Sequence, residues 1–335
     1  MPSPCLPETG EPRAAAVRGW TPVTAQLGFG LAAIGRPAYI TLGRDADLPA
    51  DRSPAALEAR AHELLDAAAA AGVGYVDAAR SYGKAEDFLA GWLRRSGARP
   101  FVASKWGYRY TADWRPDAER HEVKEHTLPA FERQWAESSA LLGPWLRLYQ
   151  VHSLTVESPL WEDRALLRAL AGVRAQGVEL GFSTSGPAQG DAVRRGLALQ
   201  VDGRPLFTSV QSTWNPLEPS AADALAEASA TGARVVVKEA LANGRLAVGD
   251  SPDTAGLAGV ARAHGVGVDV VALAAALAQP WADVVLSGAV TVAQLRSGAT
   301  ATVVAADLVG TDVADLVPPQ PAADYWAERG RLPWR

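Results

Sequence analysis

Short runs rich in Val, Ile, Leu and aromatic residues alternate along the chain with longer segments rich in Ala, Leu, Glu and Arg. This pattern is typical of β-strands that alternate with α-helices. Eight candidate strands lie near Gln26–Leu31, Gly74–Ala78, Phe101–Lys105, Leu146–His152, Val178–Ser183, Thr208–Ser212, Arg234–Lys238 and Val284–Ser287. Candidate helices between them cover Pro54–Ala71, Ala85–Arg95, Glu119–Leu142, Glu162–Ala175, Pro187–Ala198, Ser220–Ala230 and Thr254–Gln279.

Local signals support several of these boundaries. Ser53 offers a capping oxygen and Pro54 suits the first helical position, where its missing N–H costs little. Gly72, Gly177 and Gly232 each follow a helical segment and precede a strand. We expect these three glycines to take the left-handed conformation at helix ends.

The alternation predicts an α/β fold with parallel strands and right-handed crossovers. Eight units favour closure into a (β/α)8 TIM barrel with long loops at its C-terminal face. An open dinucleotide-binding sheet is the alternative, but no G-x-G-x-x-G follows the first strand. We predict a flexible tail at 1–20, a barrel at 21–316, and a C-terminal extension at 317–335 that packs on or near the barrel. The extension or the segment Tyr39–Asp51 could overhang the mouth.

Bulk properties narrow the class of partner. The chain has 335 residues, 48% hydrophobic and 21% charged, with a net charge of -5. This composition predicts a globular protein that binds neither nucleic acid nor an anionic membrane surface. The single cysteine, Cys5, allows no intrachain disulfide and no Cys-based zinc site, and a reducing cytoplasm fits best. The start resembles no secretory signal, and Val270–Ala278 is too short to span a bilayer and reads as a buried helix.

Four side chains at strand ends suggest a catalytic site. Asp77, Tyr82, Lys105 and His152 each end an apolar run or begin the loop after it. A barrel gathers the carboxyl ends of its strands around one mouth, so these side chains can converge there. A phenol can exchange a proton, an ammonium and a carboxylate can bias it, and an imidazole can orient a carbonyl oxygen.

This arrangement resembles the aldo-keto reductases from about Leu27 to Leu295. The matching positions are Asp77, Tyr82, Gly83, Glu86, Lys105 and His152. The resemblance implies that Tyr82 is the proton donor in carbonyl reduction and the acceptor in alcohol oxidation. Lys105 would lower the pKa of that phenol, Asp77 would hold Lys105, and His152 would bind the substrate oxygen. A nicotinamide cofactor, NADP(H) or NAD(H), would carry the hydride.

The resemblance also implies cofactor contacts, with departures from the family pattern. The candidate cofactor-binding residues are Ser183, Thr184, Gln211, Lys238, Ser287, Gly288 and Gln294. Thr184 stands where Asn is common, and Lys238 replaces an aromatic residue that often stacks on nicotinamide, so it either contacts the cofactor or faces solvent. Gly288 and Gln294 replace a frequent Lys and Arg, which weakens an inference of NADPH preference. Arg296 could compensate if its side chain turned inward.

Aromatic residues offer walls for a substrate pocket. Trp106 and Tyr108 follow Lys105, and Trp214 lies beyond Gln211. Large apolar rings suit such a wall, although packing against the next helix is the alternative. His121 and His126 are five residues apart, so they do not form the i, i+4 zinc pair; we predict no metal site here and a solvated helix face.

The leading interpretation is a monomeric NAD(P)(H)-dependent oxidoreductase that interconverts a small aldehyde or ketone and its alcohol. One alternative is a cofactor-binding regulatory or scaffold protein with the same barrel and little turnover. Another is a lyase or isomerase that uses Tyr82 and Lys105 without net redox change. The physiological substrate, its stereochemistry and the reaction direction are not fixed by the sequence.

Overall fold

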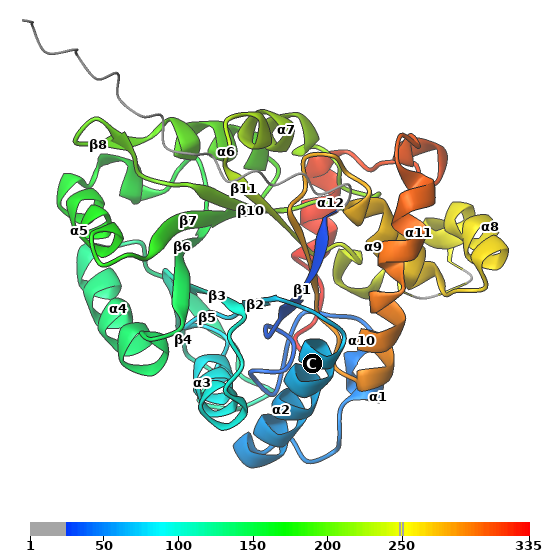
Figure 1. The fold of residues 1–335 in the computed structure, drawn as a ribbon, viewed down its shortest axis with the longest axis horizontal. Helices are drawn as coiled ribbons and strands as arrows, with labels where there is room; N and C mark the ends of the chain where they lie inside the picture. Colours follow the sequence, from blue (N-terminus) through cyan, green and yellow to red (C-terminus); the bar gives the residue numbers. More distant parts are fainter. Residues whose placement is uncertain (1–24, 248, 250) are drawn as a thin grey trace, which may run out of the picture.

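The structure is a computed structural model that describes residues 25–247, 249 and 251–335. The predicted tail at 1–20 and Cys5 therefore lie outside the described residues. Eight parallel strands form a closed barrel in the order β1-β12-β11-β10-β7-β6-β3-β2. Figure 1 shows the strands at the centre and the helices around them. The predicted (β/α)8 fold class is confirmed; the outer limits of the domain stay a prediction.

All eight predicted strands are present with closely similar limits. The barrel strands are β1 (Gln26–Gly30), β2 (Tyr75–Asp77), β3 (Phe101–Trp106), β6 (Leu146–Leu154), β7 (Glu179–Thr184), β10 (Ser209–Thr213), β11 (Arg234–Lys238) and β12 (Val284–Ser287). Two antiparallel hairpins lie outside the barrel: β4 (Tyr108–Tyr110) with β5 (Glu122–Lys124), and β8 (Gln200–Val201) with β9 (Arg204–Pro205).

The helices in chain order are α1 (Arg44–Asp47), α2 (Pro54–Ala70), α3 (Ala85–Ser96), α4 (Leu128–Leu142), α5 (Arg164–Arg174), α6 (Gln189–Ala198), α7 (Ala222–Ala230), α8 (Ala255–His264), α9 (Val268–Leu277), α10 (Val292–Ala299), α11 (Ala301–Leu308) and α12 (Ala322–Arg329). Ser53 caps α2, with its hydroxyl accepting the Ala56 amide at 3.3 Å. Gly72, Gly177 and Gly232 have φ of 79°, 85° and 83°. The predicted cap and the three left-handed turns are thus confirmed.

Two predicted helices have different limits. The segment predicted as a helix from Glu119 first forms strand β5, and α4 begins only at Leu128, after Thr127 and before Pro129. The segment Thr254–Gln279 is two helices, α8 and α9, bent by 93°. Gly265, with φ of 66°, ends α8, because a glycine reaches this conformation without strain. Val270–Ala278 is buried, as predicted.

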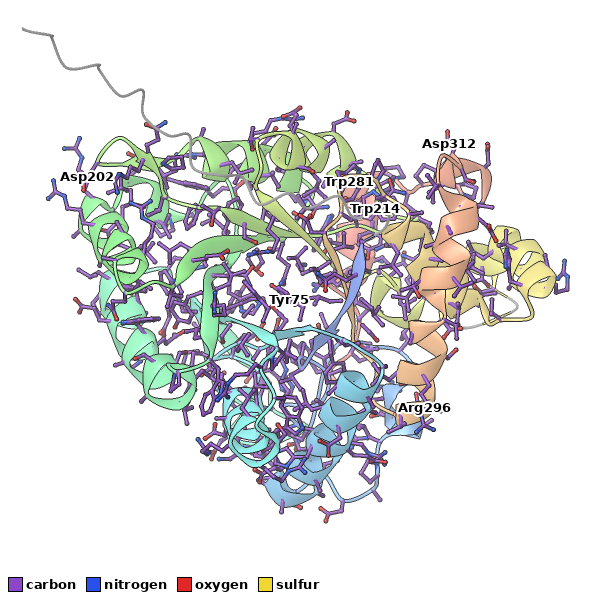
Figure 2. The ribbon with its side chains drawn as sticks, in the orientation of Figure 1. Tyr75, Asp202, Trp214, Trp281, Arg296 and Asp312 are labelled. Carbon is purple, nitrogen blue, oxygen red and sulfur yellow. The ribbon has the colours of Figure 1, made fainter. Side chains whose placement is uncertain are left out.

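The barrel interior changes from apolar to polar toward the carboxyl ends of the strands. The lower layer consists of Tyr75, Ala103, Leu148, Val236 and Val284, all buried, and Figure 2 labels Tyr75 inside the ring of strands. Alternate residues of a strand face the same side, so the residues two positions further on also point inward. The apolar layer therefore forms the floor of a polar chamber.

Two positions after Tyr75, Ala103 and Leu148 come the inward-facing residues Asp77, Lys105 and Gln150. Lys105 pairs in register with Gln150. All three side chains are nearly inaccessible to water. Buried polar groups of this kind require partners, because an unpaired charge in the interior is costly. Their contacts define the floor of the candidate site.

Among the described residues, no single helix has both the length and the hydropathy to span a membrane. Helices α8 and α9 meet both criteria only as a pair, and the pair is sharply bent.

Candidate active site

A cavity of about 680 Å³ opens at the carboxyl ends of the barrel strands. Its walls come from the loops after β1, β2, β6, β11 and β12, from the β4–β5 hairpin and from the C-terminal segment. Its lining includes Arg36, Tyr39, Asp47, Asp77, Tyr82, Tyr108, Glu122, His152, Gln211, Lys238, Glu239, Asn243, Ser287, Gly288, Gln294, Arg329 and Trp334.

The tetrad of predicted catalytic side chains, Asp77, Tyr82, Lys105 and His152, meets at the floor of this cavity. Lys105 donates to Asp77 through a buried ion pair. The Tyr82 hydroxyl lies 3.4 Å from the Lys105 Nζ and 3.4 Å from the His152 Nε2. Tyr82 is 7% exposed, so its hydroxyl is screened from bulk water but borders the cavity. The arrangement can deliver a proton to one point in the cavity.

A tight turn fixes Tyr82 at this position. Gly83, the next residue, has φ of 61°, and a Cβ there would lie 2.6 Å from the Gly35 carbonyl oxygen. Only glycine fits this close approach without moving the neighbouring loop. The Lys84 amide also donates to the Gly35 carbonyl oxygen at 2.8 Å. The loop after β1 therefore holds the end of the loop that carries Tyr82.

Two glutamines hold the second oxygen of Asp77. The Gln211 Nε2 donates to Asp77 Oδ2 at 3.0 Å, and the Gln150 Nε2 donates to it at 3.4 Å. Asp77 is thus fixed by three strands, with Lys105 on its other oxygen. Gln150 was not predicted from the sequence, although its position two residues before His152 on the same strand face was a usable signal.

Burial governs the protonation of Tyr82 and His152. Burial and the Asp77 carboxylate raise the pKa of Tyr82 well above its usual value, while the Arg36 guanidinium lowers it. The expected lowering of this pKa by Lys105 stays a prediction, because the net direction reflects mainly the desolvation of the phenol and the Asp77 carboxylate. Burial and the nearby Lys105 hold the pKa of His152 well below its usual value. Tyr82 is therefore a phenol and His152 a neutral imidazole at pH 7.

Arg36 is a site residue that the sequence analysis missed. It is 1% exposed, lines the cavity and donates to the Ser81 carbonyl oxygen at 2.9 Å. It also forms an ion pair with Glu122 of β5 at 2.9 Å. No local pattern marks Arg36, because its partners lie 45 and 86 residues further along the chain.

The C-terminal segment closes one side of the cavity. Trp334 lines it and stacks on His121, with ring centroids 4.3 Å apart. Tyr39 and Arg335 exchange backbone hydrogen bonds of 2.9 and 3.3 Å. The predicted packing of the extension near the barrel therefore has a specific form, in which the end of the chain joins the loop after β1.

An ion-pair cluster joins helix α12 to the end of β11. Arg329 donates to both carboxylate oxygens of Glu239, at 2.8 and 2.6 Å. The Lys238 Nζ donates to Thr213 Oγ1 at 2.7 Å and lies 3.4 Å from Glu239. Burial alone would raise the pKa of Glu239, but the two cations lower it to about 2. Burial lowers the pKa of Lys238 to about 8, against the opposing effect of Glu239.

The predicted cofactor residues divide into two groups. Gln211, Lys238, Ser287, Gly288 and Gln294 line the cavity. Ser183 and Thr184 are fully buried and do not line it, although the next residue, Ser185, does.

The two buried residues have other contacts. The Ser183 hydroxyl accepts the Ser153 amide at 2.8 Å and so supports the turn after His152. The Thr184 hydroxyl contacts Ser212 and Gln189. The predicted direct contacts of Ser183 and Thr184 with a cofactor are therefore not compatible with this geometry. Their hydroxyls bond to protein groups behind the cavity wall.

Gln294 organises the start of α10. Its Oε1 accepts the amides of Val290 and Thr291 at 2.9 and 3.3 Å, and its Nε2 donates to Asp47 at 2.7 Å. Two amides at this helix start are thus already bonded, and a carboxylate stands beside them. Arg296 is exposed, does not line the cavity and lies at the outer edge of α10 in Figure 2. It does not turn inward.

Of the three predicted aromatic walls, only Tyr108 lines the cavity. Its ring lies edge-on to His152, with centroids 5.0 Å apart. Trp106 is the last residue of β3 and, because Lys105 points inward, it points outward and packs on Phe131 of α4. Trp214 packs against Trp281, which Figure 2 labels beside it, and does not line the cavity. The predicted pocket roles of Trp106 and Trp214 were wrong.

The prediction that His121 and His126 lie on a solvated helix face was wrong. Both are buried, and His121 lies under Trp334. His126 bonds to the Ser158 hydroxyl and to the His152 carbonyl oxygen, each at 2.8 Å. Among the described residues, no group of three or more His, Cys, Asp or Glu side chains is arranged to hold a metal ion.

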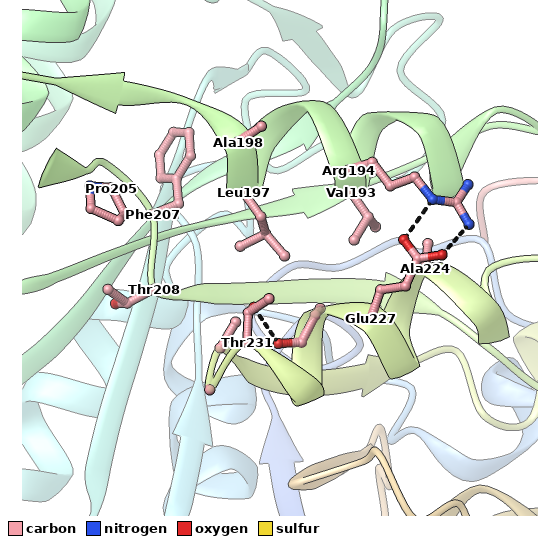
Figure 3. Close-up of a pocket in the computed structure, with 13 residues that line it drawn as sticks. Val193, Arg194, Leu197, Ala198, Pro205, Phe207, Thr208, Ala224, Glu227 and Thr231 are labelled. Atoms are coloured by element: carbon pink, nitrogen blue, oxygen red, sulfur yellow. Dashed lines mark hydrogen bonds and ion pairs between the residues drawn. The ribbon is translucent and has the colours of Figure 1, made fainter. Parts of the chain in front are cut away.

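A second hollow of about 550 Å³ lies between α6 and α7 on the outside of the barrel (Figure 3). Its lining is mainly apolar, and an ion pair between Arg194 and Glu227 bridges the two helices. No residue of the tetrad lines this hollow. The candidate active site is therefore the cavity at the barrel mouth.

Comparison with known proteins identifies the family of the chain. The model of the aldo/keto reductase family matches residues 27–314, and the chain belongs to this family. An aldo-keto reductase from Bacillus halodurans, solved as a holo form, is 19% identical, with a TM-score of 0.61 and coverage of 92% of each chain. The glycerol dehydrogenase of Gluconobacter oxydans is also 19% identical, with a TM-score of 0.62, covering 87% of this chain and 92% of that one.

Both solved structures resemble this chain in fold. No curated protein matches the chain. Family membership supports an oxidoreductase that acts on a carbonyl compound or an alcohol.

Proposed function

We propose that the protein is an NAD(P)(H)-dependent oxidoreductase that interconverts an aldehyde or ketone and its alcohol, with Tyr82 as general acid and base. The observation that carries this proposal is the position of the Tyr82 hydroxyl, 3.4 Å from both Lys105 and His152 at a cavity floor. A proton donor, a charge that biases it and an oxygen-binding imidazole are what carbonyl reduction needs.

Three features of the cavity support a nicotinamide cofactor. Its volume lies within the range of about 300–1,000 Å³ of small-molecule and cofactor sites. It extends from the tetrad to the loop at Ser287 and Gly288. Apart from Gly288 itself and its two chain neighbours, no atom lies within 4 Å of the point where a Gly288 Cβ would be. The Asn243 Oδ1 is buried in the cavity wall without a hydrogen-bond partner.

Gln211 and Lys238 at the tetrad end, with Ser287 and Gly288 at the far end, would hold the cofactor. It would supply the hydride for the carbonyl carbon.

The residues around Tyr82 would each have one task. The Ser81 hydroxyl lies 3.4 Å from the His152 Nδ1. If Ser81 donates there, the imidazole proton sits on Nε2, from which it can donate to a substrate oxygen. That oxygen would lie between His152 and Tyr82 and take the Tyr82 proton during reduction. Lys105, fixed by Asp77, would stabilise the resulting phenolate.

The contacts of Gln294 favour NAD(H) over NADP(H). Its carboxamide oxygen accepts hydrogen bonds from two backbone amides at the start of α10, and its carboxamide nitrogen donates a hydrogen bond to Asp47 beside the cavity. A carboxylate repels the additional phosphate of NADP(H) but accepts hydrogen bonds from a ribose hydroxyl. We therefore propose that NADH binds more tightly than NADPH. A small carbonyl or alcohol substrate, a monomeric state and a cytoplasmic location remain proposals from the sequence.

Cofactor binding and turnover test this function separately. Quenching of tryptophan fluorescence by NADH and by NADPH would measure both dissociation constants. Reduction of a panel of carbonyl compounds would then be followed by the absorbance of the reduced cofactor. We expect Tyr82→Phe to lower kcat by about 10²–10⁴-fold while cofactor affinity changes little.

Tyr110→Phe is a matched control, since Tyr110 lies in the neighbouring hairpin and does not line the cavity. Tight cofactor binding without turnover of any compound would instead support a regulatory or scaffold protein. Absence of cofactor binding, with turnover of another kind, would support a lyase or isomerase.

A further inference from the structure

The Arg36 guanidinium lies against the ring of the proposed acid and base. Its Cζ is 5.0 Å from the centroid of the Tyr82 ring. Its Nη1 donates to the carbonyl oxygen of Ser81, the residue that precedes Tyr82. One side chain therefore contacts the Tyr82 ring and anchors the backbone beside it.

Two further rings confine this guanidinium. Its Cζ lies 4.9 Å from the Tyr39 ring centroid and 4.8 Å from that of Trp334. Arginine suits such a site because its planar cation stacks on rings and stays charged at all working pH values. The ion pair with Glu122 fixes the guanidinium from the side of the hairpin. Arg36 is thus held in place by the loop after β1, by β5 and by the C-terminal segment.

The charged groups around Tyr82 change its pKa in opposite directions. The titratable groups that face it are Asp77, Lys105, His152, Arg36, Tyr39, Glu122 and Glu239. Burial raises the pKa of Tyr82 most, followed by Asp77; Arg36 lowers this pKa and Glu122 raises it. Lys105 is tied to Asp77, so a large part of its charge is already compensated. Arg36 is thus a second cation beside Tyr82, and its charge favours the Tyr82 phenolate.

We propose that Arg36 is a positioning residue of the reaction, which orients Tyr82 and stabilises its phenolate, and that Glu122 opposes this stabilisation. The inference rests on the proposed role of Tyr82. Tyr82 loses its proton to the substrate oxygen in reduction and regains one in oxidation, and Arg36 takes no part in this transfer. The cation–ring contact becomes more favourable when the ring carries negative charge.

The test compares both halves of one ion pair. Alcohol oxidation needs the phenolate, so its kcat should rise with pH in the wild type. An opposite charge within about 4–6 Å changes a pKa by roughly one unit or more. At a fixed pH near neutrality, Arg36→Gln should therefore lower the oxidation kcat about tenfold. Glu122→Gln should raise this kcat, because it removes the opposing charge and leaves Arg36 in place.

Two further variants separate charge from shape. Arg36→Lys keeps the charge and should recover most of the oxidation rate. Arg36→Gln made in a Tyr82→Phe background should change the residual rate by less than about twofold, because the two residues act as a unit. Arg194→Gln, at an exposed ion pair on α6, is the matched control and should leave the rate unchanged.

The direction in which Glu122→Gln changes the oxidation kcat distinguishes the proposal from a purely structural ion pair. A purely structural ion pair predicts that Arg36→Gln and Glu122→Gln both slow the enzyme, and that outcome would overturn the proposal. An unchanged oxidation rate in Arg36→Gln, with Tyr82→Phe still inactive, would overturn it while leaving the role of Tyr82 intact. If Tyr82→Phe has no effect on turnover, the proposed roles of Arg36 and of Tyr82 are both overturned.

Discussion

Replacement of Glu239 by Gln removes the centre of the ion-pair cluster that joins α12 to the barrel. Glu239 accepts both hydrogen bonds of Arg329 and also contacts Lys238. Its side chain is 8% exposed, so solvent screens these contacts little. The variant keeps the shape of the side chain but leaves two cations facing each other near the mouth. Such unpaired buried charge is strongly destabilising.

The magnitude follows from the pKa of Glu239. This pKa falls from 4.5 to about 2 on folding, and each unit corresponds to about 1.36 kcal/mol, so the ionised carboxylate contributes about 3 kcal/mol at pH 7. Because the folded pKa is the lower one, the contribution is complete above about 4.5 and is lost as the pH falls toward 2. At pH 3 about 1.4 kcal/mol should remain.

Urea unfolding followed by tryptophan fluorescence, at pH 7 and at pH 3, measures this contribution. Glu239→Gln should lose about 3 kcal/mol of the free energy of unfolding at pH 7 and roughly half of that at pH 3. Glu227→Gln is the matched control, because Glu227 also accepts two hydrogen bonds from one arginine, but at the exposed surface of α7. It should leave the urea midpoint unchanged. Equal losses at the two pH values would refute the electrostatic explanation.

Two further predictions concern the stability of the barrel. Gly196→Ala should destabilise the fold by about 1–3 kcal/mol, because its Cβ would lie 2.4 Å from the Phe182 ring. Gly172→Ala lies in α5, where no atom outside the neighbouring backbone of that helix is within 4 Å of the new Cβ, and it should instead stabilise the fold by about 0.5–1 kcal/mol. Thermal unfolding of the two variants checks the opposite signs. Burial lowers the pKa of His126 from 6.5 to about 4, so the unfolded chain takes up this proton first and stability should fall as the pH drops from 6.5 to 4. In His126→Gln the fall of the urea midpoint over this pH range should become smaller, while the part due to His152, whose pKa burial also lowers, should remain. An unchanged slope would contradict the assignment to His126.

The strands and the tetrad were predictable because local pattern determines both. A barrel strand is short, apolar and bounded by turn residues, and Asp77, Lys105 and His152 lie at or beside the ends of such runs. The errors at Trp106 and His121 have local causes too. Trp106 continues the alternation of β3 and so faces away from Lys105, while Thr127 followed by Leu128 and Pro129 marks the true start of α4.

Other site residues could not be predicted, because their contacts join distant parts of the chain. Trp334 reaches Arg36 across almost the whole sequence, and Arg329 reaches Glu239 across 90 residues. The backbone between Val151 and Leu154 is irregular, with a register shift against β7, and Ser183 bonds to Ser153 there. The positions of Ser183 and Thr184 at the end of β7 could not show that Ser185 lines the cavity and that these two residues do not.

The paired charges connect the closure of the cavity to its chemistry. Glu239 is bonded to the C-terminal helix through Arg329, and Trp334 from the same segment covers Arg36. Both Arg36 and Glu239 act on the pKa of Tyr82, with opposite signs. A displacement of the C-terminal segment would therefore expose the pocket and change the charges that act on Tyr82 in a single step. Removing this segment should alter proton transfer as well as substrate binding, because one set of contacts serves both.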